Sequence, residues 1–152
     1  MKQTPDEKSI QQKMQPGNLT LKGFLGNDQR HYHEIIAEDL KKLSQLGITK
    51  EQVADKLQEL TEMAYENFEG LAEPEPGISV EYISVRGKVL SPFSGQKPAH
   101  KGVIHYHDSI RNLSFCWTPL NIKMIRDYGF FEGKGSDNRL DPEIIYLAFF
   151  KD

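Results

Sequence analysis

The sequence predicts an α+β fold: an N-terminal αα-hairpin followed by a small, mostly antiparallel sheet with one short helix inserted. Two observations support this prediction. Residues 27–70 contain two adjoining segments with apolar side chains at helical spacing. Residues 78–90, 101–108 and 111–117 instead alternate apolar and polar side chains, with the period of two that half-buried strands show. A last apolar segment at 143–150 completes the predicted order α-α-β-β-β-α-β.

Composition limits the class of protein. The 152 residues, 38% of them hydrophobic, are enough for one domain with its own core. The single cysteine, Cys116, excludes an intrachain disulfide, so the fold needs no oxidising compartment. No apolar run reaches the roughly 20 residues of a membrane helix. The N-terminal residues also lack the apolar segment of a signal peptide. We therefore expect a soluble, cytoplasmic protein that does not bind membranes.

Changes in composition divide the chain into four regions. Residues 1–20 are polar and aperiodic, and we predict a flexible tail there. The helical hairpin is predicted over residues 21–70, and a Pro/Glu linker over residues 71–77. Residues 78–152 then form the small sheet with its short helix. We expect the sheet and the hairpin to pack together as one compact unit.

The two predicted helices of the hairpin have recognisable ends. Asn27 or Asp28 is a suitable N-cap for the first helix, and Gly47 is a suitable residue to end it. Thr49 and Gln52 have the spacing of a capping box at the start of the second helix. Because so few residues separate the helices, they must form a tight hairpin.

The second half of the chain is predicted element by element. Residues 78–90 alternate as a strand does, and residues 101–108 and 111–117 have the pattern of a strand–turn–strand hairpin. Residues 118–129 read as a short helix, because the segment opens with Thr-Pro and closes with Gly. Residues 143–150 are rich in Ile, Tyr and Phe, which favours a buried strand over a helix.

Two His-Tyr-His tripeptides begin at His31 and at His105. The first lies on a predicted helix, where residues two apart point in different directions and cannot bind one ion together. The second lies on a predicted strand, so His105 and His107 share a face and could bind a metal, with Asp108 or His100 as a further ligand. The alternative is that these histidines have no site role and lie on the half-exposed face of a strand with Tyr106 in the core, or the reverse.

A glycine-rich loop is the second candidate site. Lys134, Gly135, Ser136 and Arg139 combine exposed backbone N–H groups with side-chain donors, as small-anion and cofactor sites do. The spacing is not that of a phosphate-binding Walker A loop. The alternative is a polar turn between the short helix and the last apolar segment.

Charge is distributed unevenly along the chain. The net charge of −3 argues against nucleic-acid binding. Residues 27–69 hold ten acids and five bases, whereas residues 78–152 hold eight acids and ten bases. An acidic face on the second helix is explained by a basic partner protein or cation, by the protein's own basic C-terminal half, or by simple solvation. This face comprises Asp55, Glu59, Glu62, Glu66 and Glu69.

Two functions remain open from the sequence. The first is a non-catalytic binding or protein-interaction domain, because no catalytic residue set and no cofactor motif is assembled. The second is a small enzyme or metal-dependent protein with its site near His105, His107 and the loop Gly133–Arg139. A small sheet also leaves strand edges to be covered, so a homo-oligomer is compatible with either function.

Overall fold

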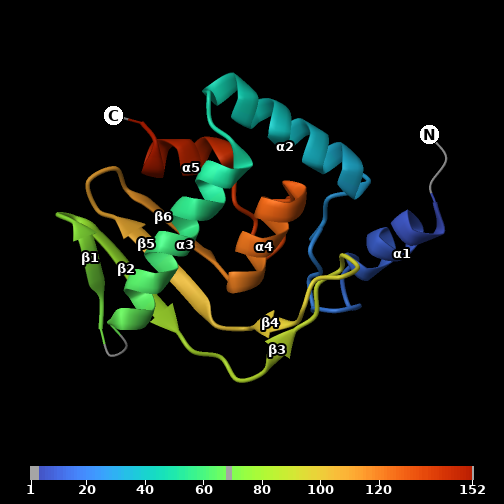
Figure 1. The fold of residues 1–152 in the computed structure, drawn as a ribbon, viewed down its shortest axis with the longest axis horizontal. Helices are drawn as coiled ribbons and strands as arrows, with labels where there is room; N and C mark the ends of the chain where they lie inside the picture. The colour runs from blue at the N-terminus through green and yellow to red at the C-terminus, as the bar shows by residue number, and fades with distance from the viewer. Residues whose placement is uncertain (1–3, 68–69, 152) are drawn as a thin grey trace.

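The fold is that of a computed structural model, which describes residues 4–67 and 70–151. Helices and strands are mixed along the chain, and the predicted α+β class is confirmed (Figure 1). The helices are α1 (Pro5–Lys13), α2 (Tyr32–Leu46), α3 (Lys50–Glu66), α4 (Pro119–Tyr128) and α5 (Pro142–Phe149). The strands are β1 (Ala72–Glu75), β2 (Ile78–Ile83), β3 (Lys88–Val89), β4 (Ala99–His100), β5 (Val103–Asp108) and β6 (Leu113–Trp117).

The larger sheet has four antiparallel strands in the order β1-β2-β5-β6, and β3 pairs with β4 in a separate two-stranded sheet. In the central strand β5, Tyr106 stands opposite Val80 of β2. Side chains alternate along β5, so Ile104 and Tyr106 are buried while His105 and His107 are exposed. One face of the sheet therefore belongs to the core, and the other face is open.

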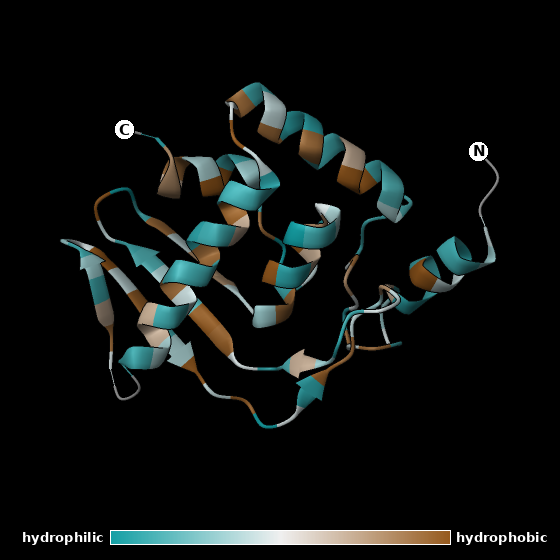
Figure 2. Cartoon of the chain, viewed as in Figure 1, coloured by the Kyte–Doolittle hydropathy of each residue, from teal (hydrophilic) through white to brown (hydrophobic). Residues whose placement is uncertain are grey.

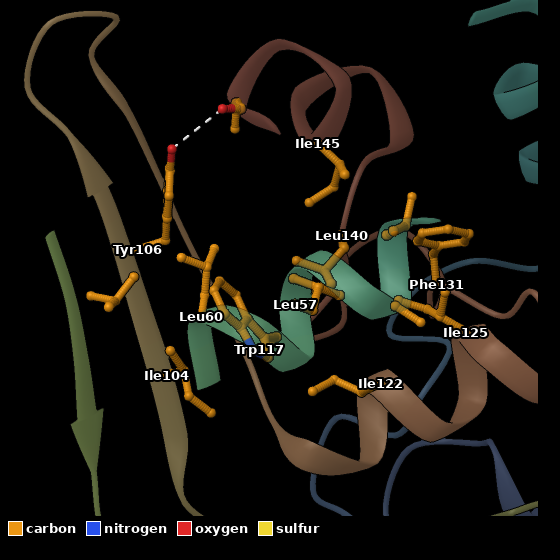
Figure 3. Close-up of a cluster of buried hydrophobic side chains, with 14 of the residues drawn as sticks. Leu57, Leu60, Ile104, Tyr106, Trp117, Ile122, Ile125, Phe131, Leu140 and Ile145 are labelled. Atoms are coloured by element: carbon orange, nitrogen blue, oxygen red, sulfur yellow. Dashed lines mark hydrogen bonds between the residues drawn. The ribbon is translucent and has the colours of Figure 1, made fainter. Parts of the chain in front are cut away.

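Helix α3 lies across the buried face of the sheet and closes the main core (Figure 1). Trp117 and Tyr106 are the largest side chains of this core, and Figure 3 shows them beside Leu60 of α3. The Trp117 indole N–H donates to the Thr61 hydroxyl at 2.9 Å, and the Tyr106 hydroxyl donates to the Ala148 carbonyl at 3.4 Å. These two bonds tie α3 and α5 to the sheet inside an otherwise apolar layer.

A second hydrophobic cluster connects α1 and α2 to α4. It includes Ile10 of α1, Tyr32 of α2, Met124 of α4 and the loop residue Phe93. The rings of Tyr32 and Phe93 meet edge to face, with centroids 5.8 Å apart. Figure 2 shows hydrophobic and hydrophilic residues alternating around α1 and α2, as expected for helices that bury one side. The N-terminal part of the chain therefore packs on the helices rather than on the larger sheet.

The predicted helical hairpin is present, with one correction at its start. Gly47 ends α2 in the left-handed region, with φ of 75°, and Thr49 forms a capping box with Gln52 at the start of α3. The N-cap of α2 is His31 rather than Asn27 or Asp28. Its ring Nδ1 accepts the backbone N–H of the residue two positions on, at 3.2 Å, which is the role that a short polar side chain usually fills.

Residues 5–13 lie within the predicted flexible tail but form α1, so that prediction is corrected. Thr4 and Glu7 make a reciprocal capping box, and Pro5 occupies the first helical position. Ile10 and Met14 then enter the second hydrophobic cluster. Residues 1–3, also part of the predicted tail, lie outside the described residues.

The prediction of a buried strand at 143–150 is wrong, because residues 142–149 form helix α5. Asp141 caps the helix by accepting the Glu143 N–H at 2.8 Å, and Pro142 occupies its first position. Ile145 and Ala148, three residues apart, both face the core. Tertiary packing has overridden the strand preference of the β-branched and aromatic residues.

The predicted linker at 71–77 also needs a correction, because it contains β1. This strand pairs antiparallel with β2 at an edge of the sheet, where a proline costs no central ladder bond. The register shifts between Ala72 and Glu75, and Pro74 lies in that interval. No helix in the described ranges has the length and apolar character that a membrane span requires.

Candidate functional site

A cavity of about 470 Å³ lies where the open face of the larger sheet meets the loop that follows α4. The segment after α1, the connections around β3 and β4, and the first turn of α4 supply the remaining walls. Its lining is apolar at Leu19, Leu21, Phe24, Val85, Val89, Val103 and Leu120, and polar or charged at Thr20, Lys101, Thr118, Glu132, Asp137 and Asn138.

Glu132 is the least expected residue of this lining. Only 4% of its surface is exposed, although an unpaired glutamate is rarely buried. Its backbone is in the left-handed region, with φ of 68°, a conformation that costs a non-glycine residue about 1–2 kcal/mol. Such strain persists only where the surroundings enforce it, and it gathers at functional sites.

Neighbouring residues hold Glu132 in this conformation. Phe131 before it is fully buried in the main core. Gly133 after it donates its N–H to the Phe24 carbonyl at 2.8 Å. A Cβ at Gly133 would lie only 2.5 Å from the Leu25 carbonyl oxygen, so glycine is required by the close approach of two backbones. The loop is therefore anchored on both sides of the glutamate.

The Glu132 carboxyl is held by an amide. Asn121, itself fully buried on α4, donates its side-chain N–H to Glu132 Oε2 at 2.6 Å. The Asn121 Oδ1 meanwhile accepts the Thr118 backbone N–H at 2.8 Å as part of the capping box of α4. The second carboxyl oxygen, Glu132 Oε1, has no hydrogen-bond partner within the described part of the chain, and the residue lines the cavity.

Burial raises the pKa of Glu132 to about 7, because a charged carboxylate is poorly solvated there. The Asn121 amide and the Ser136 hydroxyl oppose this shift, and the charge of Asp137 adds to it. The geometry of Ser136 falls short of a full hydrogen bond, so its buried oxygen is left without a partner among the described residues. Near neutral pH the Glu132 carboxyl is therefore present in both its protonated and its charged form.

The predicted anion-binding loop directly follows Glu132, but its cationic side chains, Lys134 and Arg139, are not free at the Glu132 carboxyl. The Arg139 guanidinium donates to both carboxylate oxygens of Asp39, at 2.5 and 2.9 Å, and to the Glu132 carbonyl at 2.8 Å. Lys134 is exposed, and its backbone N–H donates to Asp28. Gly135 packs against the Asn27 side chain. Of the four predicted residues, only Ser136 turns toward the Glu132 carboxyl.

The predicted metal ligands lie on the open face of the sheet. His105 and His107 are exposed on one side of β5, as the strand geometry required. Asp108 lies on the opposite, buried side, where its Oδ1 accepts the backbone N–H groups of the turn residues Ile110 and Arg111. Among residues 4–67 and 70–151, no group of three or more histidine, cysteine or acidic side chains could hold a metal ion.

The open face leads directly into the cavity. His105 stands opposite Cys116 of β6, and the Cys116 thiol lies 3.6 Å from Asn138 Oδ1 at the cavity wall. Burial, helped by the nearby acids Asp137 and Glu132, raises the pKa of the Cys116 thiol. A reactive thiolate is therefore disfavoured at this position.

The acidic face of α3 is partly neutralised within the protein. Asp55 pairs with Arg126 of α4 at 2.8 Å, which supports the explanation that the basic C-terminal half complements this helix. Glu59 lies 3.5 Å from the Lys56 ammonium group of the same helix. Glu69 lies outside the described residues.

A smaller hollow of about 240 Å³ lies between α3, α5 and the end of the sheet. Its cations are Lys56, Arg111 and Lys151. The Arg111 guanidinium, however, is occupied by the carbonyl groups of Leu147 and Lys151 at the end of α5. These contacts of Arg111 fasten the C-terminal helix to the sheet.

The sequence indicates the loop Gly133–Arg139 beside this cavity, but not Glu132, which directly precedes it. Glu132 belongs to no recognisable motif, and its relation to Asn121, a capping-box residue of α4, depends on a contact across 11 positions. A glutamate between two phenylalanines and two glycines was the one local signal. Comparisons with protein-family models, with curated proteins and with solved structures found no match to this chain.

Proposed function

We propose that this protein is a small-molecule-binding domain, and that its ligand has an apolar body and a polar end that bonds to Glu132. The observation that supports the proposal most directly is a buried carboxyl with one free oxygen, placed in a cavity with largely apolar walls. Pockets of about 300–1,000 Å³ that combine apolar walls with a few polar groups are typical of ligand sites.

The energetic cost of Glu132 supports a functional role. A buried polar group without a full set of partners costs about 1–3 kcal/mol. The left-handed backbone of the same residue adds to that cost. A protein that needed only to fill this space would retain more stability with an apolar residue, so a ligand is a physical reason for the carboxyl.

The rim of the cavity also supports a ligand with an apolar body. The side chain of Leu21 is 86% exposed and that of Val85 is 44% exposed, and both line the cavity. Exposed apolar side chains that gather beside a cavity commonly mark a binding surface. A ligand that reached from Glu132 to this rim would shield these side chains from water.

Binding of small amphipathic molecules, followed through NMR amide shifts, tests this proposal. We expect ligands to shift the amide signals of Glu132 and Gly133. A Leu21→Ser variant should weaken binding several-fold by removing part of the apolar rim. Ile110→Ser is the matched control, because Ile110 is 76% exposed on the β5–β6 turn and does not line the cavity. Equal losses in both variants, or shifts outside the cavity, would contradict the proposal.

Catalysis in the same cavity is the second candidate function. A carboxyl with a pKa of about 7 has the proton affinity of an efficient general acid or base at neutral pH. His105 and Cys116 lie beside this cavity on the open face of the sheet. A metal bound by His105 and His107 also stays a proposal. Elemental analysis of the purified, dialysed protein for zinc, iron or manganese tests it.

Three broader predictions from the sequence are kept as proposals. The exposed carboxylates of Glu59, Glu62 and Glu66 could bind a basic partner protein, because Asp55 alone of the described acidic face pairs with another element. The small anion predicted at Lys134–Arg139 has less support, since Asp39 occupies the arginine. We also propose the cytoplasm as the compartment, because one cysteine requires no oxidising surroundings.

A further inference from the structure

We infer that the ligand of the Glu132 cavity is an organic cation, with an ammonium group at the Glu132 carboxyl and an apolar chain directed toward Leu21 and Val85. This inference rests on the proposed binding function and adds the chemical class of the ligand. It derives from the charges, the hydrogen-bond groups and the shape of one cavity.

The ionisable groups of the cavity favour a cation. Glu132 and Asp137 are acids, and Lys101 is a base. Lys101 is exposed, whereas the glutamate is 4% exposed, so the charge at the deepest position is that of a carboxyl. Asp137 pairs with Lys22 at 3.3 Å, but both of those side chains are more than half exposed to solvent. The interaction of a ligand with Glu132 is therefore screened least.

The charged form of the Glu132 carboxyl favours a hydrogen-bond donor from the ligand. The Asn121 amide already donates to Glu132 Oε2 and to the Asn138 carbonyl. The Thr118 hydroxyl donates to Asn121 Oδ1 at 3.1 Å. Two groups are left over among the described residues: Glu132 Oε1, which accepts hydrogen bonds in the charged form of the carboxyl, and the Ser136 hydroxyl, whose buried oxygen has no partner. An ammonium N–H supplies both the donor and the opposite charge.

Other ligand classes fit less well. A carboxylate or phosphate would meet the Glu132 and Asp137 charges, and the nearest guanidinium, that of Arg139, is bound to Asp39. A neutral alcohol would donate one hydrogen bond without compensating a buried charge. An ammonium group differs from the alcohol by its opposite charge, whose attraction to a carboxylate is stronger at a buried position than in water.

Cation binding at this carboxyl also has a proton signature. With a pKa of about 7, Glu132 carries a proton in about half of the free molecules at neutral pH. An ammonium group binds the charged form of the carboxyl. The molecules in which Glu132 is protonated must therefore release that proton to the solvent when the complex forms. A neutral ligand does not require this release.

The experiment compares three probes of equal chain length: hexylammonium, hexanol and hexanoate. Titration calorimetry near pH 7, in buffers of different ionisation enthalpy, gives both the affinity and the protons released. We expect hexylammonium to bind about tenfold or more tightly than hexanol, which corresponds to about 1.4 kcal/mol. Its binding should release about half a proton, as follows from the pKa of Glu132.

Variants connect these results to one residue. Glu132→Gln should reduce hexylammonium affinity by about tenfold or more and abolish the proton release. Glu143→Gln is the matched control, because Glu143 is an acid of α5 that does not line the cavity. Amide shifts of Gly133 and the urea midpoint of each variant show whether the folded cavity is retained.

The outcomes distinguish a failure of the cation inference from a failure of the proposed binding function. Equal binding of hexylammonium and hexanol at the cavity, unchanged by Glu132→Gln, would overturn the cation inference and leave the binding function standing. Preferred binding of hexanoate would also overturn the inference and would restore the predicted anion site. If no probe shifts the cavity amides, even at millimolar concentration, both proposals fail. Tight hexylammonium binding with proton release and loss in Glu132→Gln supports both.

Discussion

Asp39 and Glu132 are both buried carboxyls, 6% and 4% exposed, and they differ in their partners. The Asp39 carboxylate accepts two N–H groups from Arg139, so its charge is compensated and both of its oxygens are bonded. The Glu132 carboxyl accepts one hydrogen bond, from the neutral side-chain amide of Asn121, at one of its oxygens. Burial alone therefore does not indicate the role of an acid. Whether both of its carboxyl oxygens are hydrogen-bonded is more informative.

The two carboxyls are also connected. The Arg139 guanidinium that binds Asp39 donates to the Glu132 carbonyl at 2.8 Å. The ion pair thus fastens the loop to α2 and fixes the backbone from which the Glu132 side chain enters the cavity. The paired acid maintains the structure, and the incompletely paired acid is left available for a ligand.

The largest expected effect is at the paired acid. Asp39→Asn leaves the Arg139 charge without its counter-ion, and the two side chains are only 8% and 16% exposed. Breaking such a buried pair costs about 3–5 kcal/mol, so the free energy of unfolding in urea should fall by this amount. Glu143→Gln removes the exposed pair with Lys42 and should change stability little, because solvent screens that pair. Similar effects of the two substitutions would remove the distinction between the acids.

Substitution of Glu132, the incompletely paired acid, should raise the free energy of unfolding instead of lowering it. The folded-state pKa of Glu132 is about 7 and its ordinary value is 4.5, so the folded protein binds an extra proton between these two values. Stability from this group is therefore present at low pH and is lost as pH rises through 7. Glu132→Gln cannot ionise, so it should be more stable than the natural protein by about 3 kcal/mol above pH 8 and nearly equal to it below about pH 5.

Urea unfolding at several pH values measures this difference directly. The other titrating groups are shared by the two proteins, so the difference between their unfolding free energies isolates Glu132. A Glu132→Gln variant that is less stable than the natural protein above pH 8 would show that the carboxylate has a structural partner. The contrast with Asp39 would then be lost.

Local signals in the sequence were sufficient for much of the fold. The capping box of Thr49 and Gln52 predicted the start of α3, because its atoms lie within one turn. The same kind of signal was present and overlooked at the C-terminus, where Asp141 and Pro142 cap α5. The Ile, Tyr and Phe residues of this segment favour a strand, but strand propensity is weak against tertiary packing.

The site depends on contacts that no local pattern encodes. The loop at 133–139 was recognisable by its glycines and polar residues, and the structure places it at a cavity. The burial of Glu132, however, results from residues near Phe24, which are more than 100 positions earlier in the chain. The sequence predicts that Arg139 binds an anion. Its partner Asp39 lies on a helix distant in the sequence, so no local pattern reveals this pair. Long-range pairing of charges is the part that sequence reasoning could not supply.

The smallest expected effect on stability is that of substituting Asn121, whose side chain donates to the Glu132 carboxyl. Asn121 and Thr118 form the capping box of α4 in the interior, whereas Gln52 and Thr49 form the one of α3 at the surface. Asn121→Ala should cost about 2 kcal/mol, because it removes a cap and deprives the buried carboxyl of its donor. Gln52→Ala, the matched control, should cost less than about 1 kcal/mol, since water replaces the lost group.

The two capping variants also differ in their dependence on pH. The Asn121 amide lowers the pKa of Glu132, so its removal should raise that pKa further above 7. In Asn121→Ala, the fall in stability with rising pH should therefore extend to higher pH than in the natural protein. Gln52→Ala should leave the pH profile unchanged. A shift of the profile in both variants, or in neither, would mean that Glu132 does not titrate through its contact with Asn121, and the carboxyl would need another source for its unusual proton affinity.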